Sequence, residues 1–310
     1  MTKVPDFIRS PIIVLWNYGH WCNMRCLHCY TRPSAEASSV DMTTSEAKAI
    51  AQQLIDAEVL HVHFGGGEPL GREDFLTIAK MLVTAGVSVT LSTNGSLLNE
   101  EIADQLSSLP IAMVAFSIHG TDAASHDLFN GFVGAWKRLV LAINRTVTRG
   151  IRTKLVMTIT RPVAPYAAGL LSLAQSWGVS MVQYQTFKPY GNALLHRDIL
   201  EMSPDEWRTA YKNIEAHLAL LKKEGNFKVE VDLGIDNDPE LARKLGMPLK
   251  LQQCNCGIYS ITIRPNGDVS PCGLSDHIIG NLHQASLQEI WRSSPFLIMV
   301  RRNGISPCRE

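Results

Sequence analysis

The chain has 310 residues, 45% of them hydrophobic, and its 29 lysine and arginine residues balance 29 aspartate and glutamate residues. This composition excludes a disordered chain and provides enough apolar material for one large α/β domain with a small appendage. The zero net charge gives no general attraction to nucleic acid or to an anionic membrane. The scattered tryptophans form no stripe typical of a nucleic-acid stacking surface, so we expect no nucleic-acid partner.

The amino-terminal apolar run PIIVLW, residues 11–16, is too short for the core of a signal peptide or for a bilayer span. No later segment reads as a membrane span. The seven cysteines are an odd number in a chain without an export signal. We therefore expect a cytoplasmic protein with no membrane partner, whose thiols serve metal binding or catalysis and not a disulfide framework.

Short β-rich runs alternate with helical patterns in the first two-thirds of the chain. The predicted strands are 12–18, 59–64, 87–93, 111–119, 152–160 and 180–187, and the predicted helices between them are 43–58, 73–86, 99–109, 134–150 and 166–178. The first helix opens with a capping box from Thr43 to Glu46. Such alternation predicts a parallel sheet with helices outside, either barrel-like or doubly wound.

Unusual residues follow the predicted strands at their carboxyl ends, where α/β folds build their sites. A cysteine-rich loop follows the first strand, GGGEP (65–69) the second, NGS (94–96) the third and HG (119–120) the fourth. We therefore expect a functional site along this edge of the sheet.

The rhythm changes after about residue 195. Residues 203–225 form a long amphipathic helical pattern, and residues 261–272 read as a β-hairpin that turns at Asn266 and Gly267. The last sixty residues carry the other four cysteines. This pattern predicts a barrel domain over 1–200, a linking helix and connector over 201–250, and a small carboxyl-terminal domain over 251–310.

Three cysteines, Cys22, Cys26 and Cys29, lie within eight positions of the segment GHWCNMRCLHCYTR. Their spacing allows burial on one helix face, and with His20 or His28 it allows a closed zinc tetrahedron. It also allows an iron–sulfur cluster, which is ordinarily held by four thiolates. Three thiolates would leave one iron without a protein ligand, open to a substrate or cofactor.

The spacing C-x3-C-x2-C, followed by Tyr30, resembles the signature of the radical S-adenosylmethionine (radical SAM) superfamily. The resemblance extends to the stretch from Gly66 to Pro69, which is similar to the family's glycine-rich motif that receives the methionyl amino group. Further residues match positions that contact the ribose and carboxylate of the cofactor. The resemblance thus implies a cofactor-binding set of Tyr30, Gly66, Gly67, Glu68, Pro69, Ser92, Asn94 and Ser117.

This resemblance implies an α/β fold with a (β/α)6 partial TIM-like barrel and a small carboxyl-terminal β-hairpin and helix domain. It implies a site-differentiated 4Fe-4S cluster on Cys22, Cys26 and Cys29, whose fourth iron is chelated by S-adenosylmethionine. An electron donor such as flavodoxin or ferredoxin would reduce the cluster. Reductive cleavage of the cofactor would give a 5′-deoxyadenosyl radical that abstracts hydrogen from substrate.

The segment Cys254-x12-Gly267-x4-Cys272 resembles the auxiliary-cluster extension called SPASM or, when shortened, twitch. Only Cys308 remains of the second cysteine-rich block, which favours one auxiliary 4Fe-4S cluster. The implied ligands are Cys254, Cys272 and Cys308, with Cys256 as a candidate fourth. A zinc knuckle made of the same thiols stays open, because iron and zinc share this ligand set.

Other polar residues lie near the strand ends. We expect Arg161, Tyr184, Gln185 and Lys188 to point toward the site, where a cation would suit a carboxylate. His61 and His63 read as satisfied core or supporting groups. His119, His126 and Asp127 could contact the substrate, but a structural loop is the favoured interpretation.

The substrate is the least constrained feature of the sequence. Few residues precede the first strand, which leaves no space there for the leader-binding domain of many peptide modifiers. We therefore expect a small metabolite of nucleoside, sugar or tetrapyrrole type, oxidised or decarboxylated in a biosynthetic pathway. Modification of a ribosomal peptide is the alternative. A non-enzymatic zinc or iron–sulfur module, or a redox carrier, is the alternative of another class.

Overall fold

The protein is built on one ten-stranded sheet with the order β10-β9-β8-β1-β2-β3-β4-β5-β6-β7. The computed structural model describes residues 8–31, 41–234 and 256–303. The strands are β1 (Ile13–Asn17), β2 (His61–Gly65), β3 (Ser88–Thr93), β4 (Met113–Ser117), β5 (Thr153–Ile159), β6 (Met181–Thr186), β7 (Glu230–Asp232), β8 (Ser260–Ile263), β9 (Asp268–Ser270) and β10 (Gly280–Asn281). Strands β1 to β7 pair in parallel and in chain order, which confirms the predicted parallel sheet.

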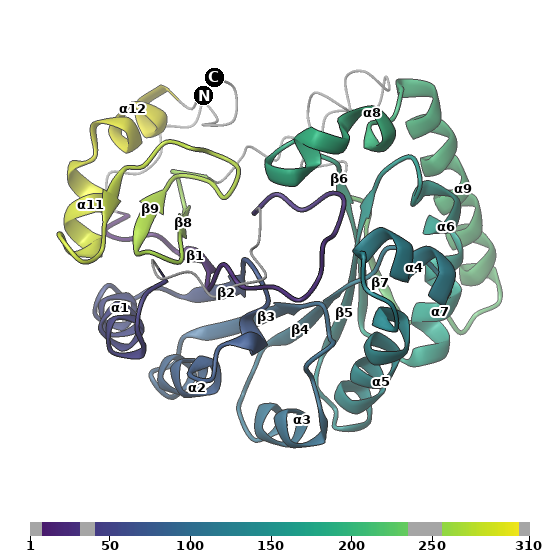
Figure 1. The fold of residues 1–310 in the computed structure, drawn as a ribbon, viewed down its shortest axis with the longest axis horizontal. Coiled ribbons are helices and arrows are strands. Elements are labelled where there is room, and N and C mark those ends of the chain that lie inside the picture. The colour runs from purple at the N-terminus through teal and green to yellow at the C-terminus, as the bar shows by residue number, and fades with distance from the viewer. Residues whose placement is uncertain (1–7, 32–40, 235–255, 304–310) are drawn as a thin grey trace.

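Helices cover the outer face of the curved sheet (Figure 1). They are α1 (Thr44–Asp56), α2 (Phe75–Thr84), α3 (Glu100–Ser107), α4 (Ala123–Asn130), α5 (Ala135–Thr148), α6 (Ala164–Ala167), α7 (Gly169–Trp177), α8 (Arg197–Leu200), α9 (Pro204–Lys223), α11 (Leu287–Ser293) and α12 (Pro295–Asn303), with 3-10 turns η1 (Pro69–Gly71) and η2 (Gly191–His196). None of the helices within the described ranges combines the length and apolarity needed to cross a lipid bilayer.

The strands sort their side chains by alternation, because neighbouring residues of a strand point to opposite faces. In β2, Val62 and Phe64 are fully buried in the core beneath the helices, whereas His61 and His63 are half-buried. In β5, Leu155 and Met157 are likewise buried, and Lys154 between two buried neighbours is half-buried. The outer face is therefore the apolar core, and the inner face of the sheet carries polar groups.

The carboxyl-terminal hairpin is part of the same sheet. Strand β8 pairs in parallel with β1, from Ile13 opposite Ser260 to Trp16 opposite Ile263, and β9 returns antiparallel to β8. The short strand β7 lies in the stretch expected as a connector. Among the described residues, the two edges of the sheet are β10 and β7, and no strand pairs the two edges.

Helix α4 lies in a segment that the sequence analysis interpreted as a loop, and that interpretation is wrong. The Asp122 side chain accepts a hydrogen bond from the Ser125 backbone N–H at the amino end of α4. At the carboxyl end, Gly131 has a φ of 61°, the left-handed conformation that glycine adopts easily. The cap residue Asp122 is the signal that could have revealed this helix.

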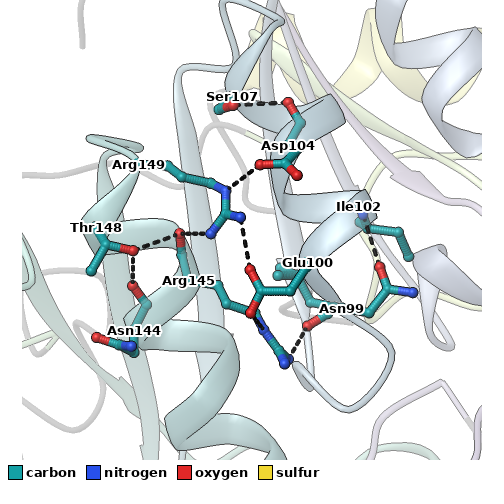
Figure 2. A network of polar contacts seen from close by, with 10 residues as sticks. Asn99, Glu100, Ile102, Asp104, Ser107, Asn144, Arg145, Thr148 and Arg149 are labelled. Carbon is teal, nitrogen blue, oxygen red and sulfur yellow. Dashed lines mark hydrogen bonds and ion pairs between the residues drawn. The ribbon is translucent and has the colours of Figure 1, made fainter.

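An exposed polar network joins α3 to α5 on the outside of the sheet (Figure 2). Glu100 accepts hydrogen bonds from Arg145 and Arg149, both at 2.7 Å, and Asp104 accepts one from Arg149 at 2.8 Å. Because the two carboxylates are largely exposed to water, solvent and salt screen these ion pairs.

A buried polar network fixes the end of β1. Asp74 accepts hydrogen bonds at 2.9 Å from the Tyr18 hydroxyl, the Arg72 guanidinium and the Thr44 hydroxyl. The Arg72 guanidinium also lies over the Tyr18 ring, 4.6 Å from its centroid. The buried Asp74 carboxylate therefore connects the end of β1 with the starts of α1 and α2.

We expect the Asp74→Ala substitution to lower the free energy of unfolding by about 3 kcal/mol, because it removes the only carboxylate partner of the partly buried Arg72 guanidinium among the described residues. The matched control is Asp104→Ala, which removes an exposed partner of Arg149 and should change little. Urea unfolding of both variants measures the difference. Equal effects would contradict a structural role for Asp74.

Candidate metal centre

The cysteine loop, residues 19–31, crosses the carboxyl edge of the sheet and is held by backbone hydrogen bonds. The Gly67 and Glu68 N–H groups donate to the carbonyl oxygens of Gly19 and Trp21, at 2.9 and 2.8 Å. Three further bonds come from other elements: Arg25 N to Asn130 O at 2.9 Å, Leu27 N to Phe129 O at 3.2 Å, and Asn192 N to Cys29 O at 2.8 Å. The loop is thereby held by the end of β2, the end of α4 and the start of η2.

Two glycines allow the cysteine loop to pass so close to the end of β2. A Cβ atom on Gly67 would lie 2.2 Å from the carbonyl oxygen of Trp21, a separation that real Cβ atoms do not show. Gly66 has a φ of 103°, and a Cβ there would lie 2.9 Å from the Cα of Asn17. Gly66 and Gly67 of the GGGEP motif are therefore required by the backbone that precedes Cys22.

The three thiols of the loop lie close enough to influence one another's ionisation. Burial, followed by the charges of Glu68 and Cys29, raises the pKa of Cys22 to about 11. Burial and the charges of Cys29 and Cys22 raise the pKa of Cys26 well above its usual value. Such thiols give up their protons when a cationic metal centre binds them.

Hydrogen-bond donors also point at the sulfur of Cys22. The Met24 backbone N–H donates to it at 3.4 Å, and the Asn94 Nδ2 donates at 3.8 Å. Such N–H donors stabilise thiolate ligands and tune the potential of an iron–sulfur cluster. None of the three thiols is in a disulfide. The residues present fit an iron–sulfur cluster on Cys22, Cys26 and Cys29.

Neither histidine proposed as a zinc ligand is directed to these thiols. The His20 ring pairs with Asp41, and the buried His28 ring packs on His119 and Phe129 at centroid distances of 4.3 and 5.1 Å. Within residues 8–31, 41–234 and 256–303, no three His, Cys, Asp or Glu side chains converge on one metal ion. Neither His20 nor His28 is therefore placed as the fourth ligand of a zinc ion on these thiols.

The residues predicted to bind a cofactor gather at the ends of β2 and β3. Glu68 is buried, and its carboxylate accepts from Leu70 N at 3.1 Å, the Thr93 hydroxyl at 2.7 Å and Asn94 N at 2.8 Å. Asn94 also donates to the Asn23 side chain at 3.0 Å. The Glu68 carboxylate therefore ties the GGGEP motif to β3, and Asn94 ties β3 to the cysteine loop.

The other predicted cofactor residues lie around this edge. Pro69 opens η1, and Ser117 is half-buried at the end of β4. Ser92 lies further down the inner face, where its hydroxyl is 2.9 Å from His63 Nε2. His63 is thus satisfied by a partner, as the sequence indicated.

Tyr30 connects the cysteine loop with the carboxyl-terminal hairpin. Burial raises the pKa of its phenol, and the nearby thiolates of Cys29 and Cys272 raise it further. Cys272 is itself buried, two residues beyond the end of β9. Tyr30 therefore lies between a ligand predicted for the first cluster and one predicted for the auxiliary cluster.

The remaining auxiliary ligands are only partly visible. Cys256 forms a single parallel bridge with Ser260, at the start of β8. Cys254 and Cys308 lie outside the described residues.

Two side chains expected to point toward the site do not. Arg161 pairs with Glu206 at 2.9 Å and donates to the Asp198 carbonyl at 2.8 Å. The buried Tyr184 hydroxyl donates to the Ala167 carbonyl at 2.6 Å, on the helix-covered face. The expectation is wrong for both residues. Arg161 is held by its ion pair with Glu206, and the Tyr184 hydroxyl is held by its hydrogen bond to Ala167. A cation that the sequence analysis missed, Lys154, lies on the inner face instead.

Comparisons with known proteins point to the family that the cysteine spacing resembles. A family model described as the Radical SAM superfamily matches residues 16–163, and one described as an iron–sulfur cluster-binding domain, SPASM, matches residues 254–310. The chain is similar to an AdoMet-dependent heme synthase of Oleidesulfovibrio alaskensis, with 25% identity over 299 residues that cover 93% of this chain and 76% of the relative. It is also similar to a PqqA peptide cyclase of Gluconobacter oxydans, with 26% identity over 306 residues that cover 97% of this chain and 82% of the relative.

Among solved structures, Streptococcus suis SuiB bound to the precursor peptide SuiA shares the fold. The TM-score is 0.76 at 14% sequence identity, over 94% of this chain and 67% of that chain.

We expect Gly67→Ala to reduce the iron bound after anaerobic reconstitution several-fold, because the new methyl group displaces the backbone of Trp21 and with it Cys22. The matched control is Gly65→Ala, two residues away, whose Cβ would meet only ordinary contacts at 3.9 Å or more. Iron per chain is measured for both variants. Full iron content in Gly67→Ala would contradict the role given to this close approach.

The pH dependence of stability reports on Glu68. Burial raises its pKa to about 7, although its three hydrogen bonds lower it. Because the folded pKa is above the unfolded value, the stabilisation is complete below about pH 4 and is lost as the pH rises through 7, by about 3 kcal/mol in all.

In cluster-free protein, we therefore expect Glu68→Gln to flatten the loss of unfolding free energy between pH 5 and pH 8. Glu101→Gln, an exposed control on α3, should keep the wild-type pH dependence. Urea unfolding at several pH values provides the comparison. Identical profiles for wild type and Glu68→Gln would show that this carboxyl does not titrate in that range.

Proposed function

The chain belongs to the radical SAM superfamily and carries a SPASM iron–sulfur cluster-binding domain, and on this premise we propose that it modifies a peptide substrate. It is an enzyme of the radical SAM type, and these two domains imply 4Fe-4S clusters, one of them auxiliary, together with S-adenosylmethionine. The peptide substrate and the roles of individual residues are our proposal.

Cys22, Cys26 and Cys29 would hold the first cluster, which supplies the electron that generates a 5′-deoxyadenosyl radical from the bound cofactor. The chain's own residues position this group. Gly66 and Gly67 allow the cysteine loop to pack against the end of β2. Asn94, which follows β3, donates hydrogen bonds to Cys22 and Asn23 of the loop. We assign cofactor binding to Tyr30, Gly66, Gly67, Glu68, Pro69, Ser92, Asn94 and Ser117. Glu68 would act indirectly, because its carboxylate accepts hydrogen bonds from the backbone of Leu70 and Asn94 and so fixes the chain around the cofactor.

The carboxyl-terminal region would hold the auxiliary cluster. We assign Cys254, Cys272 and Cys308 as its ligands, with Cys256 as a candidate fourth. The proposed division of the chain is a barrel over 1–200, a connector over 201–250 and the auxiliary-cluster domain over 251–310. Because β7 and β8 extend the barrel sheet at opposite ends, we expect these parts to form one unit.

One observation carries the peptide assignment: a peptide cyclase is similar to this chain over 97% of its length. The small-metabolite expectation stays a prediction. It rested on the short segment before the first strand, whereas a separate protein can bind a leader.

A tetrapyrrole is the second candidate substrate, favoured by the similarity to a heme synthase over 93% of this chain. The two candidates differ in product. Loss of hydrogen with formation of a cross-link would change a peptide, whereas loss of carbon dioxide would change the propionate groups of a tetrapyrrole.

We expect anaerobically reconstituted, reduced protein to release 5′-deoxyadenosine from S-adenosylmethionine, and Cys26→Ala to abolish this release. Peptides encoded beside the gene and a propionate-bearing porphyrin are then added in parallel, and mass spectrometry follows each. A mass change in a peptide, with faster release of 5′-deoxyadenosine, is the expected result.

The control compares the cluster-free forms of wild type and Cys26→Ala, whose thermal unfolding should coincide if the substitution removes only a ligand. Release of 5′-deoxyadenosine by Cys26→Ala would refute the assigned cluster. A mass change confined to the porphyrin would replace the peptide proposal with the tetrapyrrole candidate. Bound iron without any cofactor cleavage would indicate a redox carrier.

A further inference from the structure

The inner face of the sheet is lined by small and polar side chains below the edge that carries the cysteine loop. Closed barrels fill this space with bulky branched residues. Here the strands β3, β4 and β5 place mostly polar or small residues on it: Thr90, Ser92, Ala115, Ser117 and Thr158, together with Met113 and Val156. The inner face is thus more polar than the interior of a closed barrel, and Thr90, Ala115 and Thr158 are buried on it.

Lys154 is the cation of this face. It lies in register with Ala115 of β4, and Ala115 lies in register with Ser92 of β3. Ala115 therefore separates the strand position of Lys154 from that of Ser92, whose hydroxyl is hydrogen-bonded to His63. The charge of Lys154 lowers the pKa of His63, which indicates that the ammonium lies near this pair.

Lys154 has no direct carboxylate partner among the described residues. Its Nζ donates to Gln183 Oε1 at 3.0 Å, and Gln183 Nε2 donates onward to Asp232 Oδ2 at 2.7 Å. Asp232 also accepts a hydrogen bond from Gly234 N at 2.9 Å. The Gln183 side chain therefore lies between the Lys154 ammonium and the Asp232 carboxylate. Because an ammonium has three N–H groups and one is used by Gln183, two could donate to a ligand.

The charges on this face favour an anion. Burial lowers the pKa of Lys154, although Asp232 raises it. Burial, and then the charge of Lys154, lower the pKa of His63 to about 4, so this imidazole is neutral near pH 7. A half-buried cation without a direct counter-ion, beside neutral hydrogen-bonding groups, gains most from a ligand carboxylate.

We propose that Lys154, with Ser92 and His63 opposite, binds a carboxylate group of the substrate on the inner face of the sheet. This inference rests on the proposed function. The chemistry is shared by both candidate substrates, because a peptide can present a glutamate, an aspartate or its carboxyl terminus, and a tetrapyrrole presents propionates. The bound carboxylate would hold the substrate below the cysteine loop, with the rest of the molecule directed toward the loop.

The test measures the acetylation rate of individual lysines in the full chain by mass spectrometry. Glutarate should slow the acetylation of Lys154 by about tenfold when it is present at ten times its dissociation constant, whereas neutral glutaramide should have no effect. Lys80, exposed on α2, is the internal control and should react equally under all conditions.

Two further pairs of probes distinguish the sources of the carboxylate. One is a pool of short peptides with a single glutamate against the same pool with glutamine. The other is a propionate-bearing porphyrin against its methyl ester. Protection of Lys154 by only one acidic probe assigns the source, and protection by both supports a general carboxylate site.

A binding titration with the better probe follows, with Lys154→Met and Lys154→Arg. We expect about tenfold weaker binding in Lys154→Met, substantial rescue in Lys154→Arg, and no change in Lys80→Met. Equal protection by glutarate and glutaramide, protection by no probe, or wild-type affinity in Lys154→Met would each overturn the proposal. Release of 5′-deoxyadenosine without substrate is measured in parallel, so that failure of the radical SAM assignment is seen separately.

Discussion

The close approach of the cysteine loop to the end of β2 is the constraint on which the site depends. The loop carries three thiols but has little regular structure, so neighbouring elements must fix its path. Two hydrogen bonds from Gly67 and Glu68 do this at the start of the loop, and they form only because the backbone of Trp21 passes where a Cβ would otherwise stand. The glycine motif and the cysteine motif are thus parts of one structural unit, although some forty residues separate them in the sequence.

Electrostatics explains why this unit is suited to a metal cluster. Burial makes the thiolates of Cys22 and Cys26 costly, and neighbouring thiolates raise that cost further, as the raised pKa values of these two residues indicate. Hydrogen bonds from Met24 and Asn94 offset only part of the cost at Cys22. A cationic iron centre removes the remaining penalty, so the free energy of cluster binding also stabilises the fold of the loop.

Local patterns in the sequence predicted most of the fold, and they suggested the ligands of the first cluster, which stay a prediction. Strand alternation, the capping box at Thr43 and the cysteine spacing are all local signals, and the structure has the parallel sheet and α1 where they indicated. The orientation of single side chains was not predictable in this way. Arg161 and Tyr184 follow or lie on strands at the expected edge, yet their positions are decided by Glu206 and the Ala167 carbonyl, which are distant in sequence. The pairing of β8 with β1 likewise depends on a contact between the two ends of the chain.

Lys154 illustrates what such long-range contacts add. In the sequence it is a lysine inside a β-rich run, which a half-exposed strand tolerates and which carries no functional signal. The register across β3, β4 and β5 brings it opposite Ser92, and Gln183 separates it from Asp232. An ammonium group held in this way would be unfavourable in a sheet whose inner face was filled with aliphatic side chains. The polar residues around it therefore matter as much as the charge, because they provide the hydrogen-bonding surroundings in which a half-buried ammonium can bind the proposed carboxylate.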